Sequence, residues 1–175
     1  MIKAIIFDLN GIFLRSEKLS DRFEKDFKID AEIFKTKLMA IMIEVRKPKA
    51  KPAFSYWQPI LKQWKIKLNE KEFWDYWFSG EKECPEMIQY ATYLHSRGLK
   101  VFILSNNFKE RAEYYGHYPW IHQAVDKVYF SWQTGFVKPD LKAWQFILKN
   151  NNLEAKNCLF FYDKKKYYSR QRGED

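Results

Sequence analysis

Apolar residues form short runs and longer helical stripes along this chain, and the first run is the most informative. It reads Ile-Lys-Ala-Ile-Ile-Phe from Ile2, ends at Asp8, and is followed by Gly11. A run this short and apolar is typical of a strand buried on both faces of a parallel sheet. Asp8 then lies at the carboxyl end of that strand, where open α/β sheets bind ligands. An unpaired buried carboxylate is costly, so we expect Asp8 to have a metal, a partner or water.

A helical pattern follows the first run. Apolar residues recur near the helical period over residues 17–45, and short helices are predicted over 59–64 and 70–78. Between them, residues 46–52 contain two prolines and four basic residues, which predicts a loop. The aromatic run from Phe73 to Phe78 is predicted to fill the core of a small helical module.

After Cys84 the pattern changes to alternating helices and strands. Strands are predicted over 99–104, 128–131 and 158–162, with helices that start at Pro85 and Pro139. Four strands separated by helices predict an α/β fold with a doubly wound, parallel, Rossmann-like sheet. The block of about 65 residues after the first strand is too long for a simple crossover. We therefore expect a small helical cap at residues 15–80, inserted into a core formed by residues 1–14 and 81–175.

The composition and charge of the chain limit the classes of partner and compartment that we expect. The net charge is +9, but the lysines are scattered, and the only dense basic runs are residues 46–51 and 164–166. We interpret this as a solvated basic surface, with no nucleic-acid partner, whose field also attracts phosphorylated substrates. No apolar run reaches membrane-spanning length and the start lacks the layout of a signal peptide, so a cytoplasmic protein without a membrane partner is expected. Cys84 and Cys158 lack metal-site spacing and fit a reducing compartment.

Three further segments carry candidate chemistry. The strand ending at Ser105 is followed by Asn106 and Asn107, whose hydroxyl and amide groups can donate hydrogen bonds to phosphoryl oxygens. Lys138 stands just before Pro139, so its ammonium can reach a phosphate or an aspartate without breaking the helix that follows. The last predicted strand runs into Tyr162 and Asp163.

Taken in order, the four segments resemble the motifs of the haloacid-dehalogenase superfamily over nearly the whole chain. The first motif of that family, Asp-x-Asp-Gly, is matched by Asp8-Leu9-Asn10-Gly11, with Asn10 in place of the second acid. The fourth motif usually has two adjacent acids; Tyr162 replaces the first and Asp163 keeps the second. The stretch from Tyr118 to Pro139 resembles the branch with a helical cap, which includes sugar-phosphate phosphatases and the phosphatase domain fused to epoxide hydrolases.

The resemblance implies hydrolysis of a small phosphomonoester through an aspartyl-phosphate on Asp8. It assigns catalytic roles to Asp8, Asn10, Ser105 and Lys138. It assigns substrate binding to Ser105, Asn106 and Lys138. It also implies a Mg²⁺ cofactor held by Asp8, the backbone carbonyl of Asn10 and Asp163. The expected partner is a small phosphorylated metabolite, and the expected assembly is a monomer or a homodimer.

Asn10 leaves two alternatives open. An acid at this position usually protonates the leaving group, which is worth ~10²–10⁴-fold, and asparagine cannot do so at neutral pH. The first alternative is a haloacid dehalogenase, which uses the same aspartate on carbon, usually without Mg²⁺. The second is a catalytically inactive binding protein that keeps the fold.

The tail departs from the family pattern. Family members continue past the fourth strand with a helix and a fifth strand, but the residues after Asp163 have no apolar period. We therefore expect the C-terminal strand to be missing and residues 167–175 to be an out-of-frame or truncated terminus, with a genuine short variant as the alternative. An edge strand left in this way favours pairing with other chains.

Overall fold

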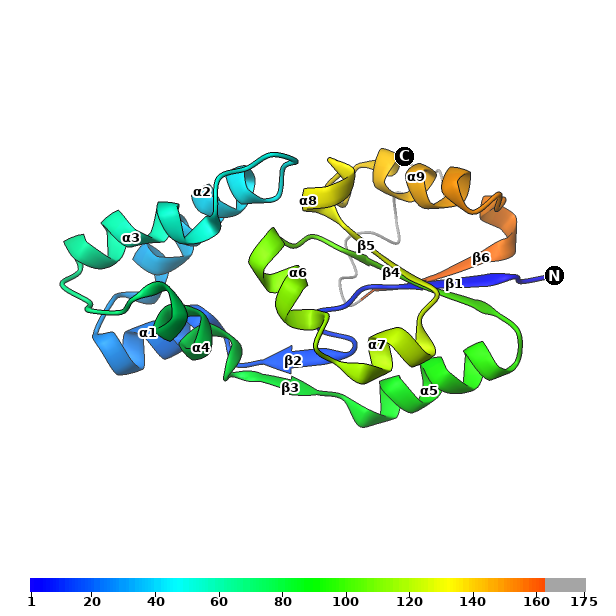
Figure 1. The fold of residues 1–175 in the computed structure, drawn as a ribbon, viewed down its shortest axis with the longest axis horizontal. Coiled ribbons are helices and arrows are strands. Elements are labelled where there is room, and N and C mark those ends of the chain that lie inside the picture. The colour runs from blue at the N-terminus through cyan, green and yellow to red at the C-terminus, as the bar shows by residue number, and fades with distance from the viewer. Residues whose placement is uncertain (163–175) are drawn as a thin grey trace.

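The chain, described for residues 1–162 by a computed structural model, contains a four-stranded parallel sheet covered by helices on both faces (Figure 1). The strand order is β5-β4-β1-β6. The strands are β1 (Ala4–Phe7), β4 (Lys100–Ser105), β5 (Lys127–Phe130) and β6 (Cys158–Phe161). The predicted doubly wound α/β fold is therefore confirmed. Asp163, the fifth strand and the tail fall outside the described residues, so the predictions about them stay open.

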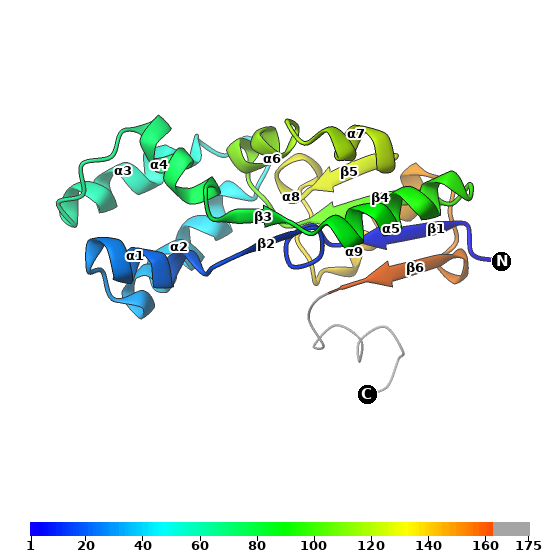
Figure 2. The same ribbon diagram turned by 90° about the horizontal axis from the view of Figure 1, so that it is seen from below.

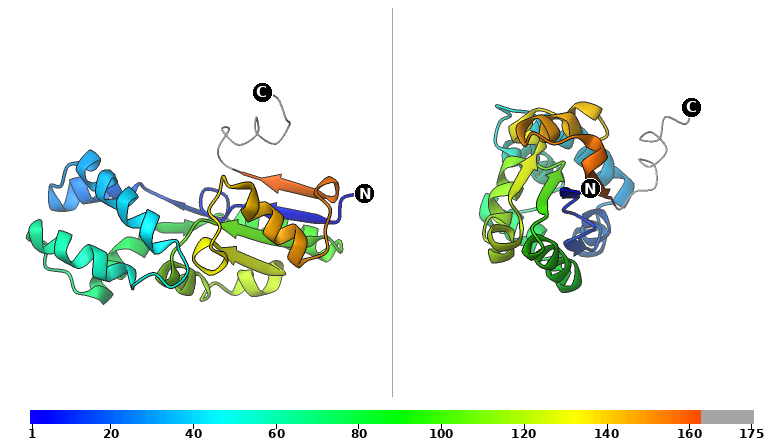
Figure 3. Two further views of the ribbon diagram at one scale, coloured as in Figure 1. Left: turned by 90° about the horizontal axis from the view of Figure 1, so that it is seen from above. Right: turned by 90° about the vertical axis from the view of Figure 1, so that its right-hand side faces the viewer.

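Strand β1 lies at the centre of the sheet, and its side chains alternate between two apolar layers. Ile5 and Phe7 pack into the layer of α5 (Pro85–Ser96) and α7 (Pro119–Ala124). Ala4 and Ile6 pack into the layer of α9 (Leu141–Asn150), on the opposite face (Figures 1 and 3). All four residues are at most 2% exposed. Burial on both faces is what the uninterrupted apolar run predicted.

Four helices form a separate block at the end of the molecule away from the N-terminus (Figure 1). They are α1 (Leu19–Phe27), α2 (Ala31–Val45), α3 (Ala53–Gln63) and α4 (Glu70–Phe78). Their shared core is mainly aromatic and includes Phe23, Phe34, Trp57 and Phe73, each fully buried. Phe73, Trp77 and Phe78 all lie in this core, which confirms the prediction for the aromatic run.

Three helix boundaries differ from the prediction. Helix α9 starts at Leu141 and not at Pro139, because Asp140 caps it by accepting a hydrogen bond from Lys142 N. The stripe over 17–45 is broken at Lys28, whose φ of 59° ends α1, and Asp30 then starts α2 by accepting hydrogen bonds from Glu32 N and Ile33 N. The apolar period continues across this break because both helices pack on one core. Helix α3 starts at Ala53 and runs through Pro59, since packing of Trp57 and Leu61 outweighs the hydrogen bond that proline removes.

A two-stranded antiparallel ribbon joins the helical block to the sheet and was not predicted. It pairs β2 (Leu14–Ser16) with β3 (Glu81–Glu83), as Figure 2 shows. The strands are short and mostly polar, so they carry no apolar alternation that a sequence pattern could detect. The predicted limits of the cap, residues 15 and 80, fall within or beside this ribbon.

Three short elements complete the description. They are α6 (Lys109–Tyr115), α8 (Ser131–Thr134) and a single 3₁₀ turn at Ala155–Asn157. Cys84 and Cys158 are both free thiols and both buried. Within residues 1–162, no helix is long and apolar enough to cross a membrane.

Candidate active site

Asp8 and Lys138 form an ion pair at the carboxyl end of the sheet. Lys138 Nζ lies 2.8 Å from Asp8 Oδ1 and donates to the Leu104 carbonyl at 2.6 Å. The Lys138 side chain is 1% exposed and the Asp8 side chain 13%. The ring of Tyr162 also covers the ammonium, with its centroid 4.3 Å from Nζ. A lysine this deeply buried requires such partners, so Lys138 is held in one place beside Asp8.

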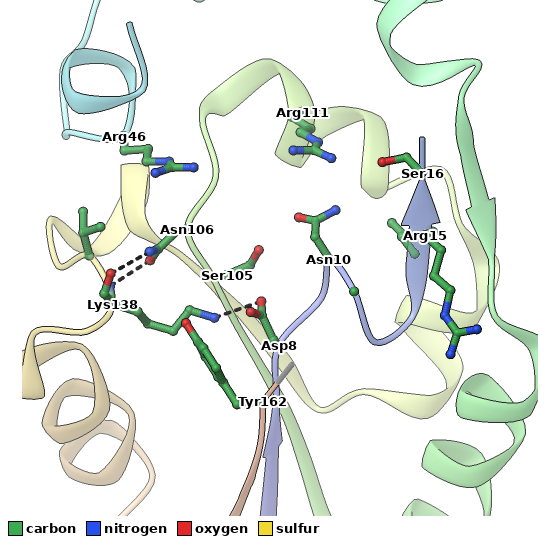
Figure 4. Close-up of a pocket in the computed structure, with 13 residues that line it drawn as sticks. Asp8, Asn10, Arg15, Ser16, Arg46, Ser105, Asn106, Arg111, Lys138 and Tyr162 are labelled. Atoms are coloured by element: carbon green, nitrogen blue, oxygen red, sulfur yellow. Dashed lines mark hydrogen bonds and ion pairs between the residues drawn. The ribbon is translucent and has the colours of Figure 1, made fainter. Parts of the chain in front are cut away.

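The backbone after β1 turns sharply and leaves Asp8 at the floor of a pocket. Gly11 adopts a φ of 93°, a region that residues with a Cβ rarely enter, and its N–H donates to the Leu14 carbonyl. This turn sends the chain into β2 and aims Asn10 back over the strand ends (Figure 4). The turn that Gly11 permits thus explains the Asp-x-x-Gly spacing in the sequence.

Ser105 and Asn107 extend the polar floor from the end of β4. Asn107 Nδ2 donates to Ser105 Oγ and to Asn10 Oδ1, each at 2.9 Å. Ser105 and Asn107 are each 1% exposed. Three residues from two neighbouring strands are therefore connected side chain to side chain. Of these, Asn107 is a component that the sequence analysis mentioned but gave no position in the site.

Asn106 holds the loop of Lys138. Its Oδ1 accepts from Lys138 N and its Nδ2 donates to Lys138 O, both at 2.8 Å. This two-point contact joins the end of β4 to the segment before α9. The direct contact of Asn106 with a phosphate stays a prediction, while its side chain in this structure fixes the backbone of Lys138.

The predicted residues of the described chain meet in one cavity of about 670 Å³ between the sheet and the helical block. Figure 4 shows Arg46 and Arg111 across this cavity from Asp8, with Arg15 pointing away. The lining residues are Asp8, Asn10, Gly11, Leu14, Arg15, Ser16, Arg46, Ser105, Asn106, Arg111, Val137, Lys138 and Tyr162. Among these described lining residues Asp8 is the only acid, and four are basic.

A buried network behind Asn10 was missed by the sequence analysis. Asn10 Nδ2 donates to the Tyr115 hydroxyl at 2.8 Å, and that hydroxyl donates to Glu81 Oε1 at 3.2 Å. Arg111 also binds Glu81 Oε1, through Nε at 2.9 Å and through Nη2. Burial raises the pKa of Tyr115, so its hydroxyl keeps its proton. The network depends on the β2–β3 pairing, which has no local sequence signal.

The donor set of the cavity suits a hard cation. Its described lining offers a carboxylate, amide and hydroxyl groups and backbone carbonyls, with no histidine or cysteine. Such oxygen ligands fit Mg²⁺, which is commonly bound by one or two carboxylates together with water and substrate phosphate. No group of three or more His, Cys, Asp or Glu residues able to hold a metal occurs within residues 1–162. Asp163, the further predicted ligand, lies beyond them.

A family model matches nearly the whole of the chain. The model describes a haloacid dehalogenase-like hydrolase, and the match covers residues 2–164. It therefore includes all four segments singled out in the sequence.

Solved structures with the same fold agree with this match. The HAD family enzyme BT-2542 from Bacteroides thetaiotaomicron, in complex with magnesium and inorganic phosphate, is 17% identical, with a TM-score of 0.77 over 94% of this chain and 86% of that chain. A predicted HAD-like family hydrolase from Porphyromonas gingivalis is 21% identical, with a TM-score of 0.74 over 98% and 87%. The L-2-haloacid dehalogenase RSc1362 is 18% identical, with a TM-score of 0.64 over 91% and 77%. At these identities the likeness establishes the fold.

Proposed function

Because the chain belongs to the haloacid dehalogenase-like hydrolase family, we propose that it hydrolyses a small phosphomonoester through an aspartyl-phosphate on Asp8. The observation that carries this proposal is the buried Asp8–Lys138 pair at the floor of a cationic cavity. A carboxylate held by a fixed cation keeps its charge and its direction, as a nucleophile must.

The side chains around Asp8 have separate roles in this reaction. Asp8 attacks phosphorus, the bond to the leaving oxygen breaks, and water later releases phosphate from Asp8. Lys138 fixes the Asp8 carboxylate and, with the Ser105 hydroxyl, stabilises the charge on the phosphoryl oxygens. Asn106 keeps Lys138 in position through its backbone.

We assign a Mg²⁺ cofactor to the same cavity. Asp8, the Asn10 carbonyl and Asp163 would hold it, and it would neutralise negative charge between Asp8 and the phosphate. The oxygen-only donor set supports this assignment. So does the magnesium and inorganic phosphate complex of the BT-2542 enzyme, which shares the fold.

The test is phosphate release from a panel of sugar phosphates and small phosphoesters, with Mg²⁺ and with EDTA. We expect turnover that requires Mg²⁺ and that is lost by more than about 10³-fold in Asp8→Asn, because an amide is no nucleophile. Asp75→Asn is the matched control, since Asp75 is an exposed acid on the outer surface of α4. Full turnover in Asp8→Asn would contradict the proposal.

A haloacid dehalogenase activity is the second candidate. The amide at Asn10 and the ring at Tyr162, in positions where family phosphatases usually have acids, favour it, and the fold is shared with the dehalogenase RSc1362. Halide release from 2-haloacids in the presence of EDTA, without phosphate release from any ester, would select this candidate. Retained binding of phosphate compounds without turnover of either substrate class would instead indicate a binding protein.

A further inference from the structure

Helix α2 carries apolar residues on two opposite sides. Its inner side places Phe34 and Ile41 in the core of the helical block. Its outer side carries Ile33, Met39 and Ile43, whose exposed fractions are 53%, 69% and 65%. In the helical block, which the structure describes in full, these are the only large apolar side chains that are exposed. A helix on a protein surface ordinarily faces water with polar residues, so a second apolar side indicates a binding partner.

The exposed residues form a continuous outer stripe, which consists of Ile33, Thr36, Met39, Ala40 and Ile43. Each of them lies three or four residues from another, the spacing at which two packed helices contact each other. The Thr36 hydroxyl donates to the Glu32 carbonyl at 2.9 Å, so it needs no partner from outside. Ala40 is small, which allows a second helix to approach closely at the middle of the stripe. The outer stripe therefore has the composition and spacing of a helix–helix contact.

The two ends of the outer stripe carry the same charged motif, Glu-x-x-Lys. Glu32 Oε1 lies 2.6 Å from Lys35 Nζ, and Glu44 Oε1 lies 2.9 Å from Lys47 Nζ. All four side chains are partly or largely exposed. A second copy of α2 in the parallel direction would set each acid against an acid. A second copy in the antiparallel direction reverses the order of the motif, so each acid meets a base.

We propose that the outer stripe of α2 is the interface of a homodimer, in which two copies of the helix pack antiparallel about a two-fold axis. The axis passes between Met39 and Ala40, at the centre of the two charged motifs. Lys35 then lies opposite Glu44 of the second copy, and the other acid and base of the two motifs also face each other. Moving the axis to position 38 would instead set Glu32 against Glu44, so the charges favour one register.

Self-complementarity is the reason for choosing a second copy of this chain as the partner. In a two-fold interface the same surface lies on both sides, so it must match itself after rotation. The outer stripe meets this condition, because its apolar centre faces an apolar centre and its ends exchange opposite charges. One helix from each copy makes a small interface, so we expect a dimer that dissociates at micromolar concentrations. The exposed ion pairs contribute mainly to the register and little to the affinity.

Sedimentation velocity of the full chain, from about 1 to about 500 μM, tests the dimer. We expect a concentration-dependent shift from monomer to dimer. Ile43→Lys should raise the dimer dissociation constant by at least about tenfold, because it places an ammonium group in the apolar contact. Leu141→Lys is the matched control, since Leu141 is 57% exposed at the start of α9 and away from α2.

Two results of this experiment overturn the proposal. The first is a chain that stays monomeric over the whole range, which would leave the outer stripe to a different protein. The second is a dimer that Ile43→Lys leaves unchanged, as pairing through an edge of the sheet would.

Charge reversal at low salt tests the register. Lys35→Glu sets an acid against Glu44 of the second copy, so it should raise the dissociation constant by about threefold or more. Adding Glu44→Lys restores an attractive pair and should return most of the affinity. A double variant that dimerises no better than Lys35→Glu alone overturns the proposal.

Disulfide formation under mild oxidation tests the antiparallel geometry. Ala40→Cys lies beside the proposed axis, so it should form a disulfide with its own counterpart. Thr36→Cys should not, because the proposed register separates its two copies by about 10 Å along the helices. The native Cys84 and Cys158 are buried, so they contribute little background. Equal yields of cross-linked dimer from the two variants overturn the two-fold arrangement.

Discussion

The helical block and the sheet are stabilised by different side chains and contribute differently to the site. The block is held by an aromatic core in which the rings of Phe23, Phe34, Trp57 and Phe73 pack in tilted, edge-to-face and stacked pairs. The sheet is held by layers in which aliphatic side chains outnumber aromatic ones, and the polar groups of the site lie at the strand ends. The block contributes Arg46 to the cavity, whereas Asp8, Ser105 and Lys138 all come from the sheet side. The buried core of the block therefore serves stability alone, whereas the strand ends on the sheet side serve both stability and the proposed chemistry.

The largest expected effect is at the strand ends. Lys138→Met removes the buried cation beside Asp8, so we expect turnover to fall by roughly 10³-fold or more and the free energy of unfolding to fall by about 3–5 kcal/mol. Phosphate release and urea denaturation measure the two effects. The double variant with Asp8→Asn should regain most of the stability but none of the activity. If Lys138→Met alone were as stable as the wild type, the Asp8–Lys138 ion pair would not stabilise this part of the fold.

The matching change in the block affects stability alone. Trp57→Ala leaves a large void in the aromatic core, and we expect it to cost about 3–5 kcal/mol of unfolding free energy. Urea unfolding monitored by circular dichroism and by hydrogen exchange across α1–α4 measures this cost. Trp57→Phe is the milder control. If the folded Trp57→Ala protein also lost phosphate release, the division between the two regions would be wrong.

Asp126 tests the sheet away from the site through its pH dependence. Burial opposes its charge, but hydrogen bonds from Lys100 Nζ and Val101 N, each 2.8 Å, lower the pKa of Asp126 below its usual value. Its stabilisation is thus fully present above the unfolded aspartate pKa, near 3.9, and is lost as the pH falls through the lower folded pKa. Asp126→Asn should cost about 1–2 kcal/mol at pH 7 and remove that dependence. Melting temperatures of the wild type and of Asp126→Asn between pH 7 and pH 2.5 measure this pH dependence. If the two melting temperatures changed in parallel over this range, the prediction would be contradicted.

The smallest effect is at the start of α4. Asn69 and Glu72 form a capping box, with Asn69 Oδ1 accepting from Glu72 N at 3.0 Å and Glu72 Oε2 accepting from Asn69 N at 2.8 Å. Asn69→Ala should cost about 1 kcal/mol, and Asn69→Ser should restore most of it. Chemical denaturation measures the change in unfolding free energy, and phosphate release measures any change in kcat. A change in kcat larger than the change in stability would show that α4 affects the chemistry.

The sequence predicts what depends on local pattern. The run before Asp8 shows both the strand and the acid at its end, and the positions of Ser105 and Lys138 follow from the ends of their own segments. Parallel strands then bring Asp8 and Ser105 together, because their carboxyl ends meet at one edge of the sheet, and Asn106 holds the loop of Lys138 beside them.

What the sequence does not predict depends on pairing between distant segments. Glu81 reaches Tyr115 only because β2 and β3 pair, and neither strand has an apolar alternation. Arg46 is visible in the sequence only as one charge in a basic loop, and its direction comes from the packing of α2. The role of Asp163 as a metal ligand stays a prediction.

The β2–β3 ribbon couples the position of the helical block to a side chain of the site. Glu81 belongs to the strand that returns from the helical block, and it is also the last acceptor in the chain that starts at Asn10. A displacement of β3 that separated Glu81 from Tyr115 would break this hydrogen bond and leave the Tyr115 hydroxyl free to reorient. The direction of the hydrogen bond from Asn10 to Tyr115 is therefore coupled to the position of β3, the strand that carries Glu81.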